Sequence, residues 1–295
     1  TLAALLATRA EGSRGRRLLA GTALSAGMLV RAALVIYALP LGWLVLRAKG
    51  QGTRPAPCLV WVAAGAAPFA IALLAHNALR FGDPLATGYA GEAFSTPPWE
   101  GIGGLLLSPG KGVWLHAPPV LLSLVLWPRF RRAYPPLGEF LALAWAIALL
   151  FYGTWWAWDG GWGWGPRLLV PLLPLSCLPL LMLPAQGRWW AAAGAALALG
   201  AAVNVLGLLS DPATLHAQAA ARCADAARCM AWTARDAPVV AAVRTLADGR
   251  SEPLALFHLA GSGLPHTWSV GAPALLGVGL IVSAWRLVRA ARPRS

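Results

Sequence analysis

Long uninterrupted apolar runs are the feature that most constrains how this 295-residue chain can fold. A helix needs about 20 apolar residues to cross a bilayer, and backbone groups there must be satisfied within the protein. The runs are rich in Leu and Ala and lack the alternating pattern of membrane barrel strands. We therefore predict an all-α fold, a polytopic integral membrane helical bundle. The predicted spans are 57–77, 113–127, 137–154, 168–184, 189–209 and 268–285.

A further apolar stretch, 18–46, is interrupted by Arg31. A single helix over this stretch would bury an arginine near the middle of the membrane, which is costly. We predict a hairpin of two short helices that turns at about Arg31, which places its guanidinium at the far interface. Composition supports a membrane location, because 58% of residues are apolar and only 12% are charged, against about 25% charged in soluble proteins.

The basic residues gather on one side of the predicted spans. Of the 24 Lys and Arg residues, 15 fall in the connections on that side, which the positive-inside rule assigns to the cytoplasm. The C-terminus is then cytoplasmic, and segments 78–112, 155–167 and 210–267 lie outside. The net charge of +13 therefore indicates membrane topology, and we predict a lipid bilayer partner and no nucleic acid.

No internal repeat or linker divides the sequence, so we predict a single integral membrane domain over 1–295. The chain begins with Thr1 rather than Met, and its first residues read as the end of an apolar element. We expect it to be the C-terminal part of a longer, multi-pass protein of the plasma membrane.

A dense aromatic run, 155–167, follows the apolar run 137–154. It holds five tryptophans, one acid and one arginine among thirteen residues. An aromatic belt at the headgroup level explains scattered tryptophans but not the glycines between them. Indole faces stack on sugar CH surfaces and an arginine fork binds phosphate, so the run predicts a binding surface. Its candidate substrate-binding residues are Trp155, Trp156, Trp158, Trp162, Trp164 and Arg167, with Asp159 accepting hydrogen bonds from hydroxyl groups.

The outer segment 78–112 reads as an irregular loop rich in glycine and proline. Lys111 lies between two glycines there, which predicts a flexible, exposed cation that binds phosphate. Tyr89 and Glu92 of the same segment complete the candidate substrate-binding set. A lone histidine such as His116 is more often a packed, hydrogen-bonded residue than a catalyst.

The spacing of Cys and His matches no zinc site, so no metal or cofactor is predicted, and a divalent cation held by carboxylates is left open. Cys223 and Cys229 lie in the outer segment 210–267, where an oxidising compartment permits a disulfide. A continuous helix would hold them about 9 Å apart, beyond the roughly 7 Å limit for a bridge. A disulfide therefore requires a helix break between them, and both alternatives stay open.

Several segments together resemble one enzyme family over about residues 18–185. The resemblance is to the C-terminal part of bacterial membrane glycosyltransferases of the GT-C class, in the protein-mannosyltransferase-like group. The segments are Asn77 with Phe81-Gly82-Asp83-Pro84, Thr87-Gly88-Tyr89, Ser108-Pro109-Gly110-Lys111-Gly112, Pro118-Pro119 and the run 155–167.

The resemblance implies a GT-C-like bundle with irregular outer loops. It also implies transfer of a sugar from a polyprenyl-phosphate donor to an acceptor, not identified here, on the outer face. Lys111 and Arg167 would neutralise the donor phosphate. In this family the catalytic acid lies in an outer loop near the N-terminus, to which nothing in this chain corresponds. The catalytic residue is thus unknown, and Asp159 is the candidate within this sequence.

The alternative is a transporter or lipid flippase that carries out no chemistry. Such a protein needs polar or ionisable groups near the middle of its spans and often has paired broken helices. Here the polar residues gather at one face, which favours the enzyme.

Overall fold

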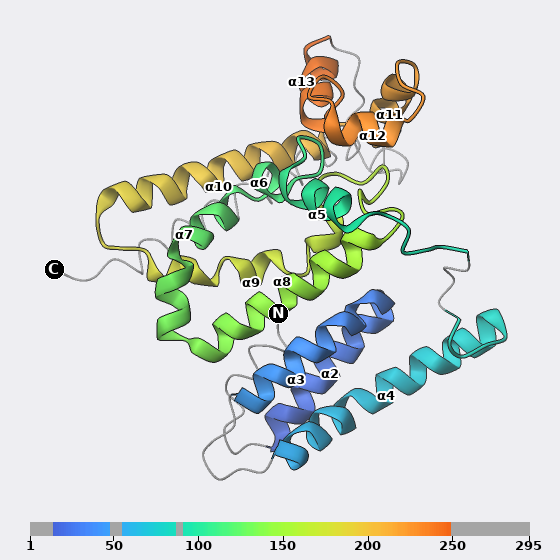
Figure 1. Cartoon of the computed structure of the whole chain (residues 1–295), viewed down its shortest axis with the longest axis vertical. Coiled ribbons are helices and arrows are strands. Elements are labelled where there is room, and N and C mark those ends of the chain that lie inside the picture. The colour runs from blue at the N-terminus through green and yellow to red at the C-terminus, as the bar shows by residue number, and fades with distance from the viewer. Residues whose placement is uncertain (1–13, 48–54, 87–90, 249–295) are drawn as a thin grey trace, which may run out of the picture. The chain divides into compact units, whose positions relative to one another are not determined.

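The computed structural model describes residues 14–47, 55–86 and 91–248, which divide between two compact units, 1–200 and 201–295. These residues form helices and no strands, so the all-helical prediction is confirmed for them (Figure 1). Within the described ranges, three helices are long and apolar enough to cross a membrane: α4 (Pro55–Phe81), α8 (Pro135–Thr154) and α10 (Gly187–Leu208). They coincide with the predicted runs 57–77, 137–154 and 189–209.

Helix α2 (Arg14–Val30) packs closely along α4 (Figure 1). Glycines allow this approach, because a Cβ on Gly65 would lie 2.8 Å from the Cα atom of Leu18. Thr22 Oγ1 also donates a hydrogen bond to the Gly65 carbonyl at 2.9 Å. Small residues with a hydroxyl at the contact are the usual way in which membrane helices bring their backbones together.

The chain breaks after α2 at Arg31, which has an extended backbone (φ −150°, ψ 106°). It continues in η1 (Ala32–Tyr37) and α3 (Ala38–Arg47), and α3 packs against α8. The two helices are joined at one end, where Arg47 Nε and Trp43 Nε1 donate to Glu139 Oε2 at 2.7 and 3.0 Å. These two exposed hydrogen bonds connect the end of α3 to the second turn of α8.

The predicted span 113–127 is not one helix. Helix α6 (Val113–His116) ends before α7 (Pro118–Ala133) begins, with Ala117 between them at φ −137° and ψ 60°. Proline has no N–H and disfavours helical geometry in the residue before it, so Pro118 causes this break.

The predicted span 168–184 is also interrupted. It forms the short elements η2 (Arg167–Leu169), α9 (Leu173–Ser176) and η3 (Leu178–Met182). The prolines at 171, 174, 179 and 184 each remove a hydrogen-bond donor, so the kink expected from the sequence becomes a series of short turns.

The segment 78–112, which the sequence predicts as an irregular loop, contains a helix, α5 (Pro98–Leu107). Pro98 suits the first position of a helix, and Glu100 lies in its first turn. Helix α5 packs against α8 (Figure 1) because Gly101 and Gly153 meet where a side chain on Gly101 would collide with backbone atoms. This contact places α5 beside the segment that follows α8.

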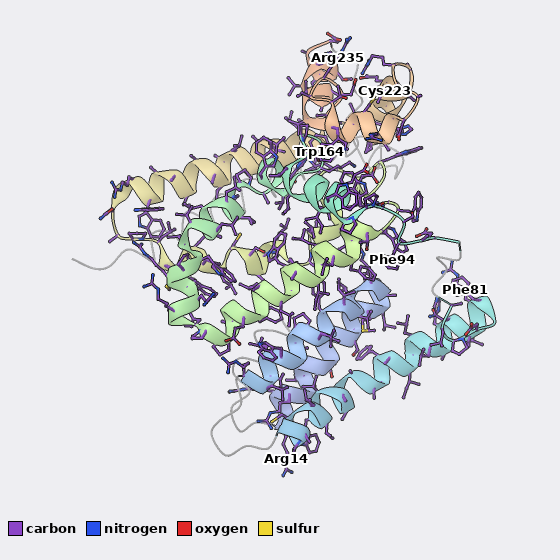
Figure 2. All side chains as sticks on the ribbon, in the orientation of Figure 1. Arg14, Phe81, Phe94, Trp164, Cys223 and Arg235 are labelled. Carbon is purple, nitrogen blue, oxygen red and sulfur yellow. A yellow bond between two sulfur atoms is a disulfide. The ribbon has the colours of Figure 1, made fainter. Side chains whose placement is uncertain are left out.

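The second unit contains α11 (Pro212–Ala220), α12 (Ala226–Trp232) and α13 (Pro238–Ala247). Cys223 and Cys229 form a disulfide, with their Cα atoms 6.5 Å apart (Cys223 is labelled in Figure 2). The bridge is possible because α11 ends at Ala220 and α12 begins at Ala226. Of the two alternatives left open by the sequence, the structure thus has the helix break and the disulfide.

The predicted span 268–285, residues 249–267 of the outer segment, and Tyr89 lie outside the described residues. The single domain over 1–295 and the side of the membrane on which each segment lies stay predictions.

Gly65→Ala should lower the melting temperature in detergent, because the added methyl group overpacks the α2–α4 contact. Overpacking costs about 1–3 kcal/mol. The matched control is Gly194→Ala in α10, where a Cβ meets nothing within 4 Å. That change should leave the melting temperature unchanged or raise it. Equal melting temperatures for Gly65→Ala and the unmodified chain would show that the two helices are not in close contact.

Candidate functional site

Residues 155–167, here called the Trp-Gly loop, leave the end of α8 in a series of tight turns. Trp158 N donates to the Trp155 carbonyl at 3.1 Å, and Gly160 N donates to the Ala157 carbonyl at 2.9 Å. Gly160 and Gly161 have φ values of +72° and +61°, a region that other residues rarely adopt. The glycines between the tryptophans therefore have a structural reason, which is to let the loop fold back on itself.

Lys111 holds this loop from within. Its Nζ donates to the Gly161 carbonyl at 2.6 Å and to the Gly163 carbonyl at 2.7 Å, and the residue is only 1% exposed. The sequence-based prediction of an exposed, flexible Lys111 is wrong. A buried ammonium group persists only where acceptors replace its water, and the two loop carbonyls provide that replacement.

The charge on Lys111 responds to its surroundings. Burial lowers the pKa of Lys111 to about 8, with the nearby Asp159 carboxylate raising it and the Arg167 guanidinium lowering it further. Lys111 lies outside the three long apolar helices, between α5 and α6. At neutral pH it is mostly protonated, so the loop is built around a fixed positive charge.

Arg167 is the exposed cation of the loop. Its aliphatic part lies over two glycines, since a Cβ on Gly160 would lie 2.9 Å from Arg167 Cγ and one on Gly163 would lie 3.1 Å from Arg167 Nε. Within the described ranges, Arg167 makes no side-chain hydrogen bond or ion pair. Its forked donors are thus available to an anion.

Three of the candidate tryptophans pack inward to different degrees. Trp158 is 7% exposed, and its ring lies where a side chain on Gly104 of α5 would be. Trp155 is half-buried and meets Phe94 edge to face, with ring centroids 5.1 Å apart. Trp164 is half-buried, and its buried Nε1 has no hydrogen-bond partner among the residues described (Phe94 and Trp164 are labelled in Figure 2). Trp158 is therefore a core residue of the loop.

The other two tryptophans face outward. Trp162 is 58% exposed and Trp156 is 53% exposed. Asp159 lies between them in sequence and is half-exposed. Its Oδ1 accepts a hydrogen bond from Gly161 N at 3.1 Å, an Asx turn that helps to shape the loop.

Glu92 is brought to this loop by the segment that follows it. Trp156 N donates to the Ala93 carbonyl at 3.0 Å, and Thr96 Oγ1 donates to the Trp155 carbonyl at 2.9 Å. Glu92 is half-buried. Of the two candidates in this outer segment, the structure thus places Glu92 near the loop, while Tyr89 lies outside the described residues.

His116 was expected to be a packed residue, and the structure places it beneath the loop. It is buried, and its Nδ1 lies 3.0 Å from the Gly112 carbonyl. A Cβ on Gly165 would lie 2.8 Å from His116 Cγ, so the loop rests directly on this ring. Sequence reasoning missed the supporting roles of Gly104 and Phe94, because their partners Trp158 and Trp155 lie far along the chain.

In the described part of the chain, no group of three His, Cys, Asp or Glu residues could hold a metal ion. Comparisons of the chain with protein-family models, with curated proteins and with solved structures find no match.

The lowered pKa of Lys111 predicts a pH-dependent step in stability. Between pH 8 and 10.5 the unfolded chain holds a proton that the folded chain has released, so stability should increase with pH over this window. Over the whole window the free energy of unfolding should increase by about 3 kcal/mol. Melting temperatures of the unmodified chain and of Lys111→Met, measured in detergent from pH 7 to 10.5, isolate it. The difference between them should grow in favour of the unmodified chain above pH 8, and a constant difference would contradict the lowered pKa.

Proposed function

We propose that this chain is part of a GT-C-like membrane glycosyltransferase that moves a sugar from a polyprenyl-phosphate donor to an acceptor on the outer face. The observation that carries the proposal is Arg167, which is exposed, has no ion pair with any described residue, and lies on glycines in the same loop as the exposed Trp162. An arginine fork binds phosphate through parallel hydrogen bonds, and indole rings stack on sugars. The loop offers both groups directly after a helix that is long enough to cross a membrane.

The reaction assigns a role to Arg167. In the transfer, the bond between the anomeric carbon and the donor phosphate oxygen breaks, and the phosphate leaves with the electron pair. The acceptor oxygen forms the new bond to that carbon, and its proton passes to a base. Arg167 would stabilise the charge that develops on the leaving phosphate, an effect that is strong when the donor group is already positioned.

Lys111 supports this role from behind the loop. Its ammonium group is engaged by the Gly161 and Gly163 carbonyls, so we assign it to positioning the loop and raising the local positive potential. The candidate base in this chain is Asp159, whose Oδ1 is used by Gly161 N and whose second oxygen is available to a hydroxyl. Glu92, Trp155, Trp156 and Trp164 would shape the rest of the sugar site, and Tyr89 stays a candidate.

We further propose that the protein is a multi-pass protein of the bacterial plasma membrane, with the loop outside and the C-terminus in the cytoplasm. The disulfide between Cys223 and Cys229 supports this orientation. Disulfides persist in oxidising compartments and are rare in the cytosol, and this pair lies in a segment assigned to the outside.

The distribution of charge along the long helices favours an enzyme over a transporter or lipid flippase. Glu139 lies near the start of α8, Arg188 near the start of α10 and Arg80 near the end of α4. A transporter would need such groups near the middle of its spans.

Arg167→Lys should weaken binding of undecaprenyl phosphate about tenfold, because lysine replaces two parallel hydrogen bonds with a point charge. Binding would be measured by titration of the purified chain in detergent. Arg188→Lys, a change of an exposed arginine in α10, is the matched control and should bind like the unmodified chain. Unchanged binding by Arg167→Lys would remove Arg167 from the site.

The two classes of tryptophan should respond differently to replacement by phenylalanine. Trp162→Phe should keep the melting temperature and weaken binding of a polyprenyl-phosphate hexose by about 1–2 kcal/mol, through loss of an N–H donor and of stacking area. Trp158→Phe should lower the melting temperature, because it leaves a cavity against Gly104. If Trp162→Phe binds the hexose donor as tightly as the unmodified chain, the exposed tryptophans are interfacial anchors.

A further inference from the structure

Arg31, the arginine at the break between α2 and η1, lies against the same end of α8 from which the Trp-Gly loop departs. Its Cζ atom lies 5.5 Å from the ring centroid of Tyr152, a residue that is buried and two positions before Thr154, where α8 ends. Among the residues that the structure describes, no acid pairs with Arg31 and no side-chain hydrogen bond satisfies its guanidinium. The cation thus lies against the Tyr152 ring with no counter-ion from the described residues.

A second unsatisfied donor lies on η1, the element that follows Arg31. The hydroxyl of Tyr37 is buried, the residue being 9% exposed, and within 14–47, 55–86 and 91–248 it has no hydrogen-bond partner. Tyr37 is the last residue of η1, which Arg31 directly precedes. Element η1 packs against α8, the helix that carries Tyr152. Buried hydroxyl groups without a partner are rare in folded proteins, because each one destabilises the fold. An unpaired phenol beside an unpaired guanidinium points to a ligand that accepts hydrogen bonds and carries negative charge.

We infer that Arg31, Tyr37 and Tyr152 form a binding site for a phosphate group, separate from Arg167. The guanidinium provides a fork of donors, the Tyr37 hydroxyl provides one more, and the Tyr152 ring holds the guanidinium from behind. A phosphate at this place comes either from a lipid headgroup, which is abundant where spanning helices end, or from solution. The inference rests on these three residues and is independent of the proposed glycosyltransferase function.

Other arginines that lie over aromatic rings lack this combination. Arg14 has the same 5.5 Å contact with Trp61, but it is exposed and belongs to α2, whereas the Tyr37 hydroxyl belongs to η1. Arg47 lies over Trp43, and Glu139 neutralises its charge. Arg14 is therefore a matched control, because it makes a ring contact of the same length from the first residue of α2.

Tyr37→Phe tests the inference with two readouts of opposite sign. Without added phosphate or lipid, removal of the unpaired hydroxyl should raise the melting temperature of the full chain in lipid-free detergent. The same variant should bind phosphate about tenfold more weakly. A hydroxyl that only stabilises the fold would instead lower the melting temperature and leave phosphate binding unchanged.

Binding would be measured in an Arg167→Gln background, so that the loop proposed to hold the donor does not contribute. The probes are inorganic phosphate, titrated by calorimetry, and short-chain phosphatidylglycerol, counted by native mass spectrometry. Arg31→Gln should weaken binding more than tenfold, and Arg14→Gln should leave it within about twofold. Saturation by inorganic phosphate identifies a soluble ligand, and saturation by phosphatidylglycerol alone identifies a lipid headgroup.

Four results would overturn the inference. In the first, neither probe saturates one site per chain. In the second, Tyr37→Phe binds the probe as tightly as its background. In the third, Arg14→Gln weakens binding as much as Arg31→Gln, which indicates general attraction between cations and anions. A lower melting temperature for Tyr37→Phe would also overturn it, because the hydroxyl would then have a partner within the protein.

Discussion

The candidate site depends on one interaction, in which the ammonium group of Lys111 donates hydrogen bonds to the Gly161 and Gly163 carbonyls. A buried charge is tolerated only when acceptors surround it, so the loop must fold with these two carbonyls turned inward. This arrangement joins the turn after α5 to the loop after α8, although the residues lie about 50 positions apart in sequence. The loop's other cation, Arg167, is left at the surface.

Glycine contacts set the positions of the elements around this charge. Gly101 and Gly153 bring α5 against α8, and Gly104 leaves room for the ring of Trp158. On the other side of the loop, Gly165 rests on His116. A side chain at any of these positions would push apart two backbone segments, or a backbone segment and a ring. The shape of the loop therefore depends on how closely the helices pack. A glycine contact of the same kind joins α2 to α4, because Gly65 meets Leu18 near the start of α2. The proposed phosphate site at Arg31 follows the other end of α2.

Apolar length and composition were enough to predict α4, α8 and α10, because a long helix of apolar residues is a local property of the sequence. Prolines explain why 113–127 and 168–184 are interrupted, but the sequence does not say whether a proline bends a span or ends it. The burial of Lys111 could not be predicted, since glycines on both sides of a lysine suggest exposure and its acceptors lie far along the chain. For the same reason, the sequence of 155–167 does not show which tryptophans are buried. Trp158 packs on Gly104, whereas Trp162 is exposed.

Hydrogen exchange at the amides of the Trp-Gly loop tests most directly whether Lys111 holds it as a fixed surface. In the unmodified chain, the amides of Trp158 and Gly160 donate to carbonyls within the loop and should exchange slowly. In Lys111→Met these amides should lose most of their protection, while those in the middle of α8 keep theirs. Exchange from the unmodified loop at the rate of an unfolded peptide, or equal protection in Lys111→Met, would contradict the account.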